Sequence, residues 1–461
     1  MELGSLQFDL FLLIALLLYW ARKQQKWRRS VLIVADFCFL VFCGLKNALW
    51  CISVILIGFL LGKVTASSRE RKRAGTLSGL LILVILFLSW YLLPKLTGAG
   101  LFPSVGMSYY ALSVAGYLFD IGNGKRESSS FSDLFLFSGN FMTFLSGPIL
   151  SSDDIDQYRE LPEYDDYSFN EGLLLILWGF FEKTVVANGL ALSVDSFFGQ
   201  IATATPARLL LSSLFYTFQL YCDFAGYSSI AMGMGKLFGV SIPENFRNPY
   251  LATNIQDFWR RWHIGLSRWF REHLYFPLGG SRKGTLRTMV NVLIVFAVSG
   301  LWHGFGLNFL AWGLLHGAAL ALYNLIRPLL NRTGMAEKTE KNLILRWIAR
   351  LLNLCFVNLA WIFFRCPSLS AAIDYISRFR EPLEFPSYIL KTMDLPEKKI
   401  WSVFAGLVIV LVVDLLREHE LLPKDWILRS PVLRYLVFLL LFASIAFLGN
   451  FELSGFLYYN F

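Results

Sequence analysis

The chain has 461 residues, of which 56% are hydrophobic and only 16% are charged. Soluble domains carry about 25% charged residues, so this balance excludes an ordinary soluble enzyme and indicates an integral membrane protein. The formal net charge of +9 does not call for a nucleic-acid partner, because Lys and Arg cluster in short loops between apolar segments, as the positive-inside bias expects.

The first apolar segments predict a bundle whose N-terminus lies outside the cytoplasm. Residues 6–21 should form the first span, and residues 31–62 a tight pair of spans that turns near 44–47. Basic loops at 22–29 and 63–73 both fit the cytoplasmic side. Because the first apolar run ends in Arg and Lys instead of a small-residue cleavage site, we expect it to be retained and not removed as a signal peptide.

The middle of the chain predicts spans interrupted by helix breakers. Residues 131–150 carry Gly139, Gly147 and Pro148, which suits a re-entrant or broken helix, and a polar loop follows at 151–170. Glu182 and Lys183 are adjacent, and we interpret them as marking a membrane boundary. The spans predicted around these features are 76–93, 105–119, 171–187, 189–202 and 207–240, with interruptions at Pro206 and Gly226.

The C-terminal third contains the longest uncharged run, residues 288–326, which is long enough for two spans. A loop rich in Pro and charge is predicted at 368–399. Further spans are predicted at 288–302, 306–326, 343–364, 401–416 and 432–450. The fold class is therefore an all-α integral membrane protein with about eleven transmembrane helices plus re-entrant and amphipathic helices, in one polytopic domain over 1–461.

Residues 244–282 are the most polar and Trp-rich stretch of the chain. Apolar residues recur there at helical spacing and Arg residues fall opposite them, a pattern typical of an amphipathic helix in or near the membrane interface. On this helical wheel His263 lies at the edge of the apolar stripe. From this pattern alone a surface anchor without chemistry is the better interpretation, and a functional element is the alternative. The stripe consists of Ile255, Phe258, Trp259, Trp262, Leu266, Trp269 and Phe270.

His303 stands in SGLWHGFG, inside the longest uncharged run. An ionisable residue at membrane depth is a functional-site candidate, and the neighbouring glycines let a ligand approach closely, although a histidine that bonds a carbonyl to join two helices fits as well. For His316, in a cleaner helical run, a structural role is the better interpretation. Asp223 is a second intramembrane charge, which could orient a histidine or hold Tyr227, Ser228 or a backbone amide.

Metal and hydrolase chemistry find no support in the sequence. It contains no H-E-x-x-H, no G-x-S-x-G and no Gly-rich phosphate loop. The six Cys lie mostly in apolar stretches without C-x-x-C spacing, so we interpret them as small buried hydrophobic residues.

A family resemblance rests on three blocks taken together: PENFRNPYL, then DFWRRWHIGLSRWFREHLYFPLGGSRKG, then SGLWHG. They resemble the membrane-bound O-acyltransferase family, in particular its bacterial branch of alginate and peptidoglycan O-acetyltransferases. The resemblance implies a ring of spans around a central tunnel that narrows at a histidine. It further implies that His303 is the catalytic residue and His263 the second family histidine, and it makes Arg260, Arg261 and Trp262 candidates for contact with the acyl donor.

The C-terminal tail, residues 451–461, ends in FLYYNF, which resembles the F-I-Y-F-Q-F motif of this branch. It differs at Leu457, Tyr459 and Asn460, whereas Tyr458 aligns with a tyrosine proposed as an acyl carrier in the family. The resemblance therefore implies an acyl-Tyr458 relay.

The function implied is transfer of acetyl from cytoplasmic acetyl-CoA, without a metal, across the inner membrane of a bacterium to an extracytoplasmic polysaccharide such as alginate or peptidoglycan. Branch members usually hand the group to a separate SGNH-type partner. Two alternatives stay open. One is D-alanyl transfer to teichoic acid. The other is a transporter without covalent chemistry, against which the sequence shows no inverted repeat.

Overall fold

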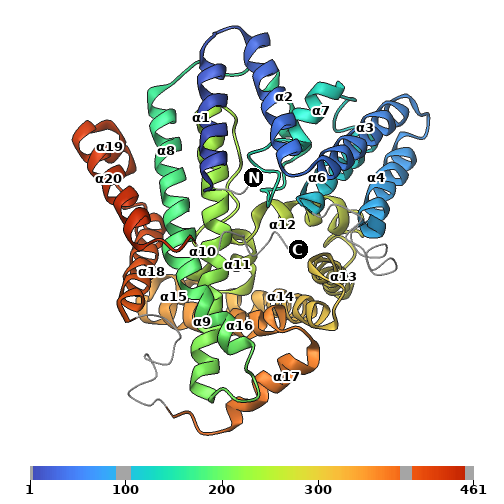
Figure 1. The fold of residues 1–461 in the computed structure, drawn as a ribbon. Helices are drawn as coiled ribbons and strands as arrows, with labels where there is room; N and C mark the ends of the chain where they lie inside the picture. Colours follow the sequence, from blue (N-terminus) through green and yellow to red (C-terminus); the bar gives the residue numbers. More distant parts are fainter. Residues whose placement is uncertain (1–3, 90–104, 385–396, 452–461) are drawn as a thin grey trace.

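The structure is a computed structural model that describes residues 4–89, 105–384 and 397–451. These residues form helices joined by turns, with no β-strand among them (Figure 1). Within the described ranges, seven helices are long and apolar enough to cross a membrane, and Leu6–Trp20 is a shorter apolar helix. The predicted all-helical membrane fold is confirmed, while the total of about eleven spans stays a prediction.

The N-terminal helices follow the predicted pattern of spans. The chain turns between α2 and α3 at Gly44, whose φ of 114° suits glycine, where the sequence predicted a tight turn. A Cβ on Gly75 would lie 2.4 Å from the Gly122 Cα, so two glycines allow α4 and α6 to pack closely. These helices are α1 (Leu6–Trp20), α2 (Gln25–Phe42), α3 (Leu45–Ser67), α4 (Arg71–Phe87) and α6 (Met107–Gly122).

The predicted broken helix is confirmed. α7 (Phe131–Ser138) is short, and the chain after it runs through the interior without regular structure as far as residue 151. Side chains satisfy this buried backbone: the Asp36 carboxylate accepts the Phe141 N–H at 2.8 Å, and Tyr227 donates its hydroxyl to the Met142 carbonyl at 3.3 Å. Non-helical backbone at membrane depth is tolerated only when it is satisfied in this way.

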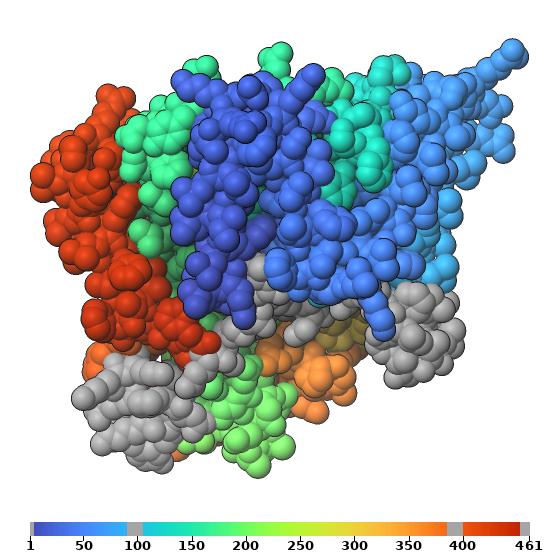
Figure 2. Space-filling model, turned by 45° about the horizontal axis from the view of Figure 1, so that its top comes forward, coloured from blue at the N-terminus to red at the C-terminus, as the bar shows by residue number. Residues whose placement is uncertain are grey.

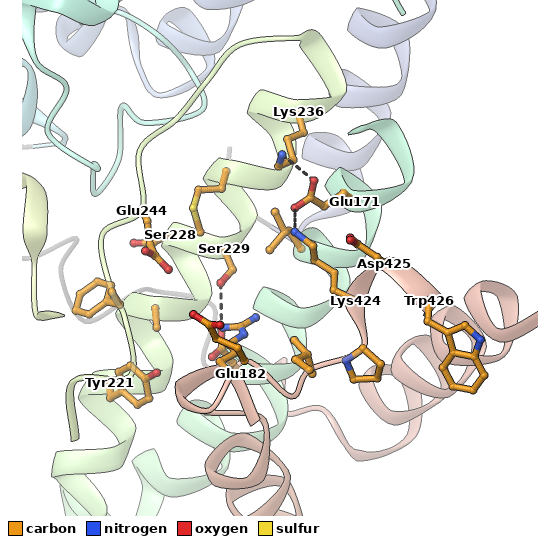
Figure 3. Close-up of a pocket in the computed structure, with 18 residues that line it drawn as sticks. Glu171, Glu182, Tyr221, Ser228, Ser229, Lys236, Glu244, Lys424, Asp425 and Trp426 are labelled. Carbon is orange, nitrogen blue, oxygen red and sulfur yellow. Dashed lines mark hydrogen bonds and ion pairs between the residues drawn. The ribbon is translucent and has the colours of Figure 1, made fainter. Parts of the chain in front are cut away.

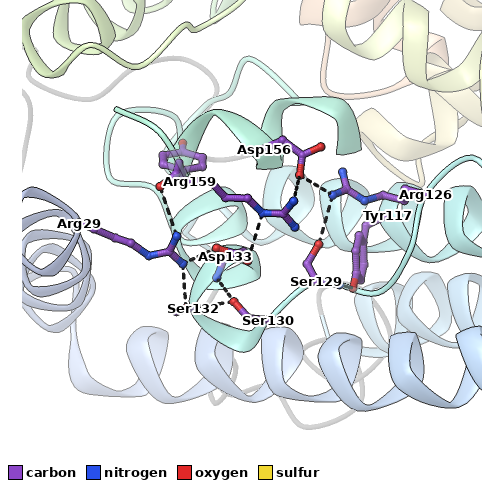
Figure 4. Close-up of polar contacts among 10 residues, drawn as sticks. Arg29, Tyr117, Arg126, Ser129, Ser130, Ser132, Asp133, Asp156 and Arg159 are labelled. Carbon is purple, nitrogen blue, oxygen red and sulfur yellow. Dashed lines mark hydrogen bonds and ion pairs between the residues drawn. The ribbon is translucent and has the colours of Figure 1, made fainter. Parts of the chain in front are cut away.

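An ion-pair network holds the start of α7 in place (Figure 4). The Ser130 hydroxyl accepts the Asp133 N–H at 3.1 Å and so caps the helix, while Arg29 of α2 binds the Asp133 carboxylate. Arg159 approaches the same carboxylate at 3.8 Å from the end of a 3₁₀ helix, Ser152–Tyr158, inside the predicted polar loop. The network therefore joins three segments that are far apart in the sequence.

Two long helical elements cross the middle of the molecule. α8 (Asp166–Phe180) continues through a π-helical segment (Phe181–Ala187) into α9 (Asn188–Phe198), and α10 (Pro206–Phe238) packs against it. The interruption predicted at Pro206 is confirmed, because α9 ends at Phe198 and α10 begins at Pro206. The interruption predicted at Gly226 is wrong, since Gly226 lies within α10, and α8 and α9 form one continuous element instead of two separate spans. Gly226 is a packing residue, because a Cβ there would lie 2.7 Å from the Gly179 carbonyl oxygen.

The C-terminal helices form the remaining wall. The predicted loop at 368–399 is corrected at its start, because Ser368 caps the short helix α17. Outer faces are apolar: Val432 and Phe447 of α20 are 77% and 86% exposed, as expected of lipid-facing residues. The last helices, in red, lie at one edge of the space-filling view (Figure 2). The helices are α13 (Thr285–His303), α14 (Leu307–Arg332), α15 (Met335–Lys341), α16 (Leu343–Arg365), α17 (Leu369–Ser377), α18 (Glu397–Glu418), α19 (Lys424–Arg429) and α20 (Pro431–Leu448).

The interior consists of two large hydrophobic clusters. The first gathers residues of α1–α4, α6 and α7 with the second half of α10, and the second gathers residues of α8–α10, α14, α16 and α18. Two short helices lie between them: α11 (Ile255–Arg261) contributes to the second cluster and α12 (Ile264–Phe270) to the first. The chain therefore passes from one cluster to the other between these two helices.

Candidate active site

Residues 244–282 do not form one continuous amphipathic helix, so the prediction of a single helix is wrong, while a position near the membrane interface stays a prediction. The helix breaks at Trp262 and His263, and a π-helical turn follows α12 at Arg271–Tyr275. The physical reason is that the apolar stripe packs in two directions, toward one cluster from α11 and toward the other from α12. A straight helix cannot do this. Most of the stripe is buried: Ile255, Phe258, Trp262, Leu266, Trp269 and Phe270.

His263 lies at the break and is 1% exposed. Its φ of 43° and ψ of 55° are left-handed, which is uncommon for a residue with a Cβ. Its Nδ1 lies 3.3 Å from the Asn245 side-chain oxygen, and the Phe224 ring packs edge-on against the imidazole at a centroid distance of 4.7 Å. The break therefore buries an imidazole between α10 and the segment before α11.

His303 is the last residue of α13 and is also buried. α13 and α14 approach closely here, because a Cβ on Gly300 would lie 2.4 Å from the Phe309 carbonyl oxygen. The rings of Trp312 and Phe364 each lie 5.1 Å from the His303 imidazole. The end of the helix thus places a histidine among aromatic rings from α14 and α16.

The structure places His263 and His303 near one another, with the Trp302 ring close to both imidazoles. The Trp302 ring lies 4.7 Å from the His303 imidazole and 6.2 Å from that of His263, centroid to centroid. Burial lowers the pKa of His263 well below its usual value, and the nearby His303 lowers it further. His263 is therefore neutral at pH 7, so its imidazole carries both an N–H donor and an acceptor nitrogen.

His316, for which the sequence favours a structural role, is buried and hydrogen-bonded to a neighbouring side chain. Its Nδ1 accepts the Trp259 indole N–H at 3.3 Å. Trp312 lies between it and His303, 5.2 Å from the His316 ring, so the α13–α14 hairpin places both histidines in one aromatic cluster.

The three residues proposed for donor contact lie in different surroundings. Arg261 is bound by Asp257 at 2.9 Å and by Glu418 at 2.5 Å, and Trp262 is 1% exposed among aromatic rings. Arg260 is exposed, and no ion pair to it is found within the described ranges. Arg260 is therefore the one of the three whose charge is available to a ligand.

Arg260 lines a cavity of about 310 Å³, which we name the arginine cavity. Arg271 is a second exposed arginine on its wall, again without an ion pair in the described part of the chain. The buried Ser299 also lines the cavity and precedes His303 on α13 by one helical turn. Its apolar wall includes Trp259, Phe270, Val292, Val295, Phe296 and Leu320.

A second and larger cavity, about 770 Å³, lies between α8, α10 and the segment around α19; we name it the polar cavity (Figure 3). At one side Glu171 binds both Lys236 at 2.8 Å and Lys424 at 3.0 Å. At the other side, the Ser229 hydroxyl donates to the Glu182 carboxylate at 3.4 Å. This cavity therefore runs from paired surface charges to a buried acid.

Glu182 and Lys183 do not mark a membrane boundary. Both are buried in the π-helical segment, where Lys183 forms an ion pair with Asp223 of α10. This pair gives Asp223 a partner that the sequence did not suggest, beside the histidine, Tyr227, Ser228 or amide that were considered. Sequence distance hid the contact, since forty residues separate the two charges.

Tyr458 lies outside the described residues, so its role stays a proposal. The last part of the described chain is anchored in the interior: Asn450 donates its N–H to the Thr184 carbonyl at 2.9 Å and accepts the Asn188 amide at 2.7 Å.

Among the described residues, no group of three or more His, Cys, Asp or Glu side chains is arranged to hold a metal ion.

Sequence reasoning missed Asn245 as a neighbour of His263 and Ser228 as a neighbour of Asn245. Asn245 is 0% exposed, and its amide nitrogen lies 3.5 Å from the Ser228 hydroxyl oxygen on the wall of the polar cavity. A signal was present in the sequence, because Asn245 belongs to the PENF motif. Periodicity gave no reason to pair that motif with a histidine eighteen residues later.

Comparison with known proteins places this geometry in context. A peptidoglycan O-acetyltransferase of Helicobacter pylori is 40% identical over 251 residues, which cover 54% of this chain and 46% of that protein. A probable alginate O-acetylase of Pseudomonas fluorescens is 33% identical over 370 residues, covering 79% of this chain and 72% of the relative. A teichoic acid D-alanyltransferase of Bacillus subtilis is 30% identical over 198 residues, covering 38% and 49%.

The family comparison covers most of the chain. The chain spans less than half of the length of the Helicobacter relative. The match therefore does not establish which substrate this chain uses. The model of the family described as "MBOAT, membrane-bound O-acyltransferase family" matches residues 3–364, which include His263, His303 and every residue that lines the arginine cavity. The chain belongs to the membrane-bound O-acyltransferase family, and as an enzyme it is an O-acyltransferase.

Proposed function

We propose that this O-acyltransferase moves an acetyl group from cytoplasmic acetyl-CoA across the inner membrane of a bacterium for O-acetylation of an extracytoplasmic polysaccharide. The observation that carries the proposal is the arginine cavity, which joins two exposed arginines to the helix turn before His303. Relatives named as alginate and peptidoglycan acetylating enzymes support acetyl as the group and a polysaccharide as the acceptor.

The arginine cavity suits an anionic donor with an uncharged arm. Arg260 and Arg271 present guanidinium groups that bind phosphate well, and the wall beyond them is apolar and aromatic. Acetyl-CoA carries phosphates at one end and a thioester at the other. In the proposed pose, the phosphates contact the arginines and the thioester lies beyond Ser299, next to His303.

The chemistry then needs one base at the thioester. His303 takes the proton of the attacking hydroxyl, a C–O bond forms at the thioester carbonyl, the C–S bond breaks, and the proton passes to the departing thiolate. The attacking hydroxyl belongs to the acceptor or to Tyr458, whose phenol has a reference pKa near 10 and therefore needs such a base. His263 supports His303 from the other side of Trp302.

Two further parts of the proposal concern the acceptor side. We propose that an SGNH-type partner outside the membrane receives the acetyl group and transfers it to the polysaccharide. D-alanyl transfer is the competing function within the family, since a teichoic acid D-alanyltransferase is among the relatives. The family membership replaces the transporter alternative, because it makes the chain an acyltransferase.

Intact-protein mass spectrometry after incubation with acetyl-CoA tests the proposal on the full chain. We expect wild type to gain one acetyl mass, and both His303→Ala and Tyr458→Phe to gain none. A gain that needs His303 but not Tyr458 would keep the enzyme and move the carrier elsewhere. CoA release without a gain would indicate direct transfer to an acceptor. Neither a gain nor CoA release would contradict acetyl-CoA as the donor.

A further inference from the structure

Asn245 makes four polar contacts around the break in the helix, although it lies ten residues before α11 begins. Its backbone carbonyl accepts the Ile264 N–H at 3.0 Å, and its side-chain oxygen accepts the Gly265 N–H at 3.1 Å. The same oxygen lies 3.3 Å from His263 Nδ1, and its amide nitrogen lies 3.5 Å from the Ser228 hydroxyl. One buried side chain therefore serves both the start of α12 and the imidazole.

These contacts hold an unfavourable backbone conformation in place. The left-handed conformation of His263 costs about 1–2 kcal/mol for a residue with a Cβ, so the surrounding structure must maintain it. A further backbone bond, from the Arg247 N–H to the Arg261 carbonyl at 2.9 Å, ties the same segment to the other side of the break. Residues 245–247 thus clamp the chain on both sides of His263.

The hydrogen-bond pattern also determines which nitrogen of His263 carries the proton. A backbone N–H can only donate, so the Asn245 atom that faces the Gly265 N–H must be the amide oxygen. The same oxygen faces His263 Nδ1, and an oxygen of a primary amide can only accept. Nδ1 therefore bears the hydrogen of the neutral ring, and Nε2 carries the lone pair.

We propose that Asn245 is a positioning residue that holds His263 in the Nδ1–H tautomer, with the Nε2 lone pair directed to the reaction centre shared with His303. The inference rests on the proposed function for its catalytic consequence. A lone pair at Nε2 lets His263 accept a hydrogen bond or a proton during acyl transfer. The opposite tautomer would present an N–H there instead. Asn245 acts through His263 and needs no contact with substrate.

Nitrogen-15 NMR of the full-length chain labelled with [¹⁵N]histidine in detergent micelles tests the tautomer directly. The chain has five histidines, and comparison with His263→Gln assigns the signals of interest. We expect wild-type His263 to show a protonated Nδ1 and an unprotonated Nε2. In Asn245→Leu, which has a similar volume but no hydrogen-bonding group, the Nε2–H tautomer should appear. A wild-type spectrum with a protonated Nε2 would overturn the proposal.

Kinetics and a conservative variant separate positioning from simple stabilisation. Asn245→Leu should lower kcat for acetyl transfer by about 100-fold, the lower end for lost acid–base catalysis, while KM for acetyl-CoA changes by less than about threefold. Asn245→Asp keeps the accepting oxygen and should retain the Nδ1–H signal and at least a tenth of the activity. An Asp variant as inactive as the Leu variant, despite a wild-type fold, would contradict the proposal.

The matched control is Asn291→Leu. Asn291 is equally buried, at 0% exposed, and donates its amide to the Gly280 carbonyl at 2.9 Å, away from both histidines. Its loss should lower stability but leave the His263 signals unchanged. The NMR measurement needs no substrate, so it tests the tautomer independently of acetyl transfer. If the His263 tautomer depends on Asn245 but the protein transfers no acetyl group, only the proposed function is refuted. If Asn245→Leu does not fold, the wild-type and Asn245→Asp spectra still test the tautomer.

Discussion

Two regions of this molecule bury polar side chains in different ways. Between α8 and α10, Lys183 and Asp223 neutralise one another, and glycines bring the two helices into close contact. Around the break between α11 and α12, the buried polar groups are two imidazoles and an amide: His263 and His303 lie among aromatic rings, and Asn245 is hydrogen-bonded to backbone. The first arrangement pairs opposite charges inside the protein, whereas the second surrounds the imidazoles with aromatic rings and an uncharged amide.

The difference teaches how to interpret an ionisable residue at membrane depth. A charge whose partner is another protein charge is accounted for by the fold, since an unpaired buried charge would be very costly. A buried imidazole at a helix end or a helix break is not accounted for in this way. Variants in the first region should therefore change stability, and variants in the second should change catalysis.

The largest effect is expected for His303→Ala. Loss of the proposed base should lower the acetyl-transfer rate by about 1,000-fold or more, with the protein still folded. Single-turnover CoA release from purified protein measures it. His316→Gln is the matched control, because it changes a buried histidine on the neighbouring helix and should retain most of the activity. Comparable losses of acetyl-transfer activity in the two variants would contradict a catalytic role that belongs to His303 and not to His316.

Asp223→Ala should act on stability. It leaves the Lys183 ammonium buried without its carboxylate, which costs about 3–5 kcal/mol in free energy of unfolding. Thermal unfolding in detergent measures the loss. The double variant Lys183→Met with Asp223→Leu should recover much of the stability, because it removes both charges together. A single variant as stable as wild type would show that the pair contributes nothing to the fold.

Arg260→Gln together with Arg271→Gln should weaken donor binding. Loss of two phosphate-binding charges should raise KM for acetyl-CoA about tenfold or more and leave kcat within about threefold, since the reacting atoms lie farther along the cavity. Arg287→Gln, an exposed basic residue near the start of α13, serves as the control. An unchanged KM would exclude the arginine cavity as the donor site.

The fourth prediction concerns helix packing, where no effect on catalysis is expected. Gly226→Ala places a Cβ 2.7 Å from the Gly179 carbonyl oxygen, so α8 and α10 must separate slightly. We expect a loss of about 1–3 kcal/mol in stability, measured by thermal unfolding, with activity per folded molecule retained. Ser212→Ala, a substitution elsewhere on α10, is the control variant. Gly124→Ala would be a poorer control, because the backbone φ of Gly124 is positive. Wild-type stability of Gly226→Ala would show that the two helices can separate without cost.

Much of the fold followed from one-dimensional patterns. Apolar runs located α1, the α2–α3 turn and the α13–α14 hairpin, because a span requires a continuous apolar segment whatever surrounds it. The glycines and the proline in this segment also predicted the broken helix after α7, because these residue types interrupt a helix whatever surrounds them. The candidate histidines were recognised from the sequence because a titratable group within an apolar run is conspicuous, and residue motifs identified the family.

Only the tertiary structure revealed the partners of those residues. The pairing of Lys183 with Asp223, the contact of Asn245 with His263 and the burial of the stripe from Ile255 to Phe270 all join segments that no local period relates. The sequence by itself determined which segments are apolar and where chemistry-bearing residues stand. The packing of two hydrophobic clusters determined that the helix breaks at His263, because α11 and α12 each bury their apolar side chains in a different cluster.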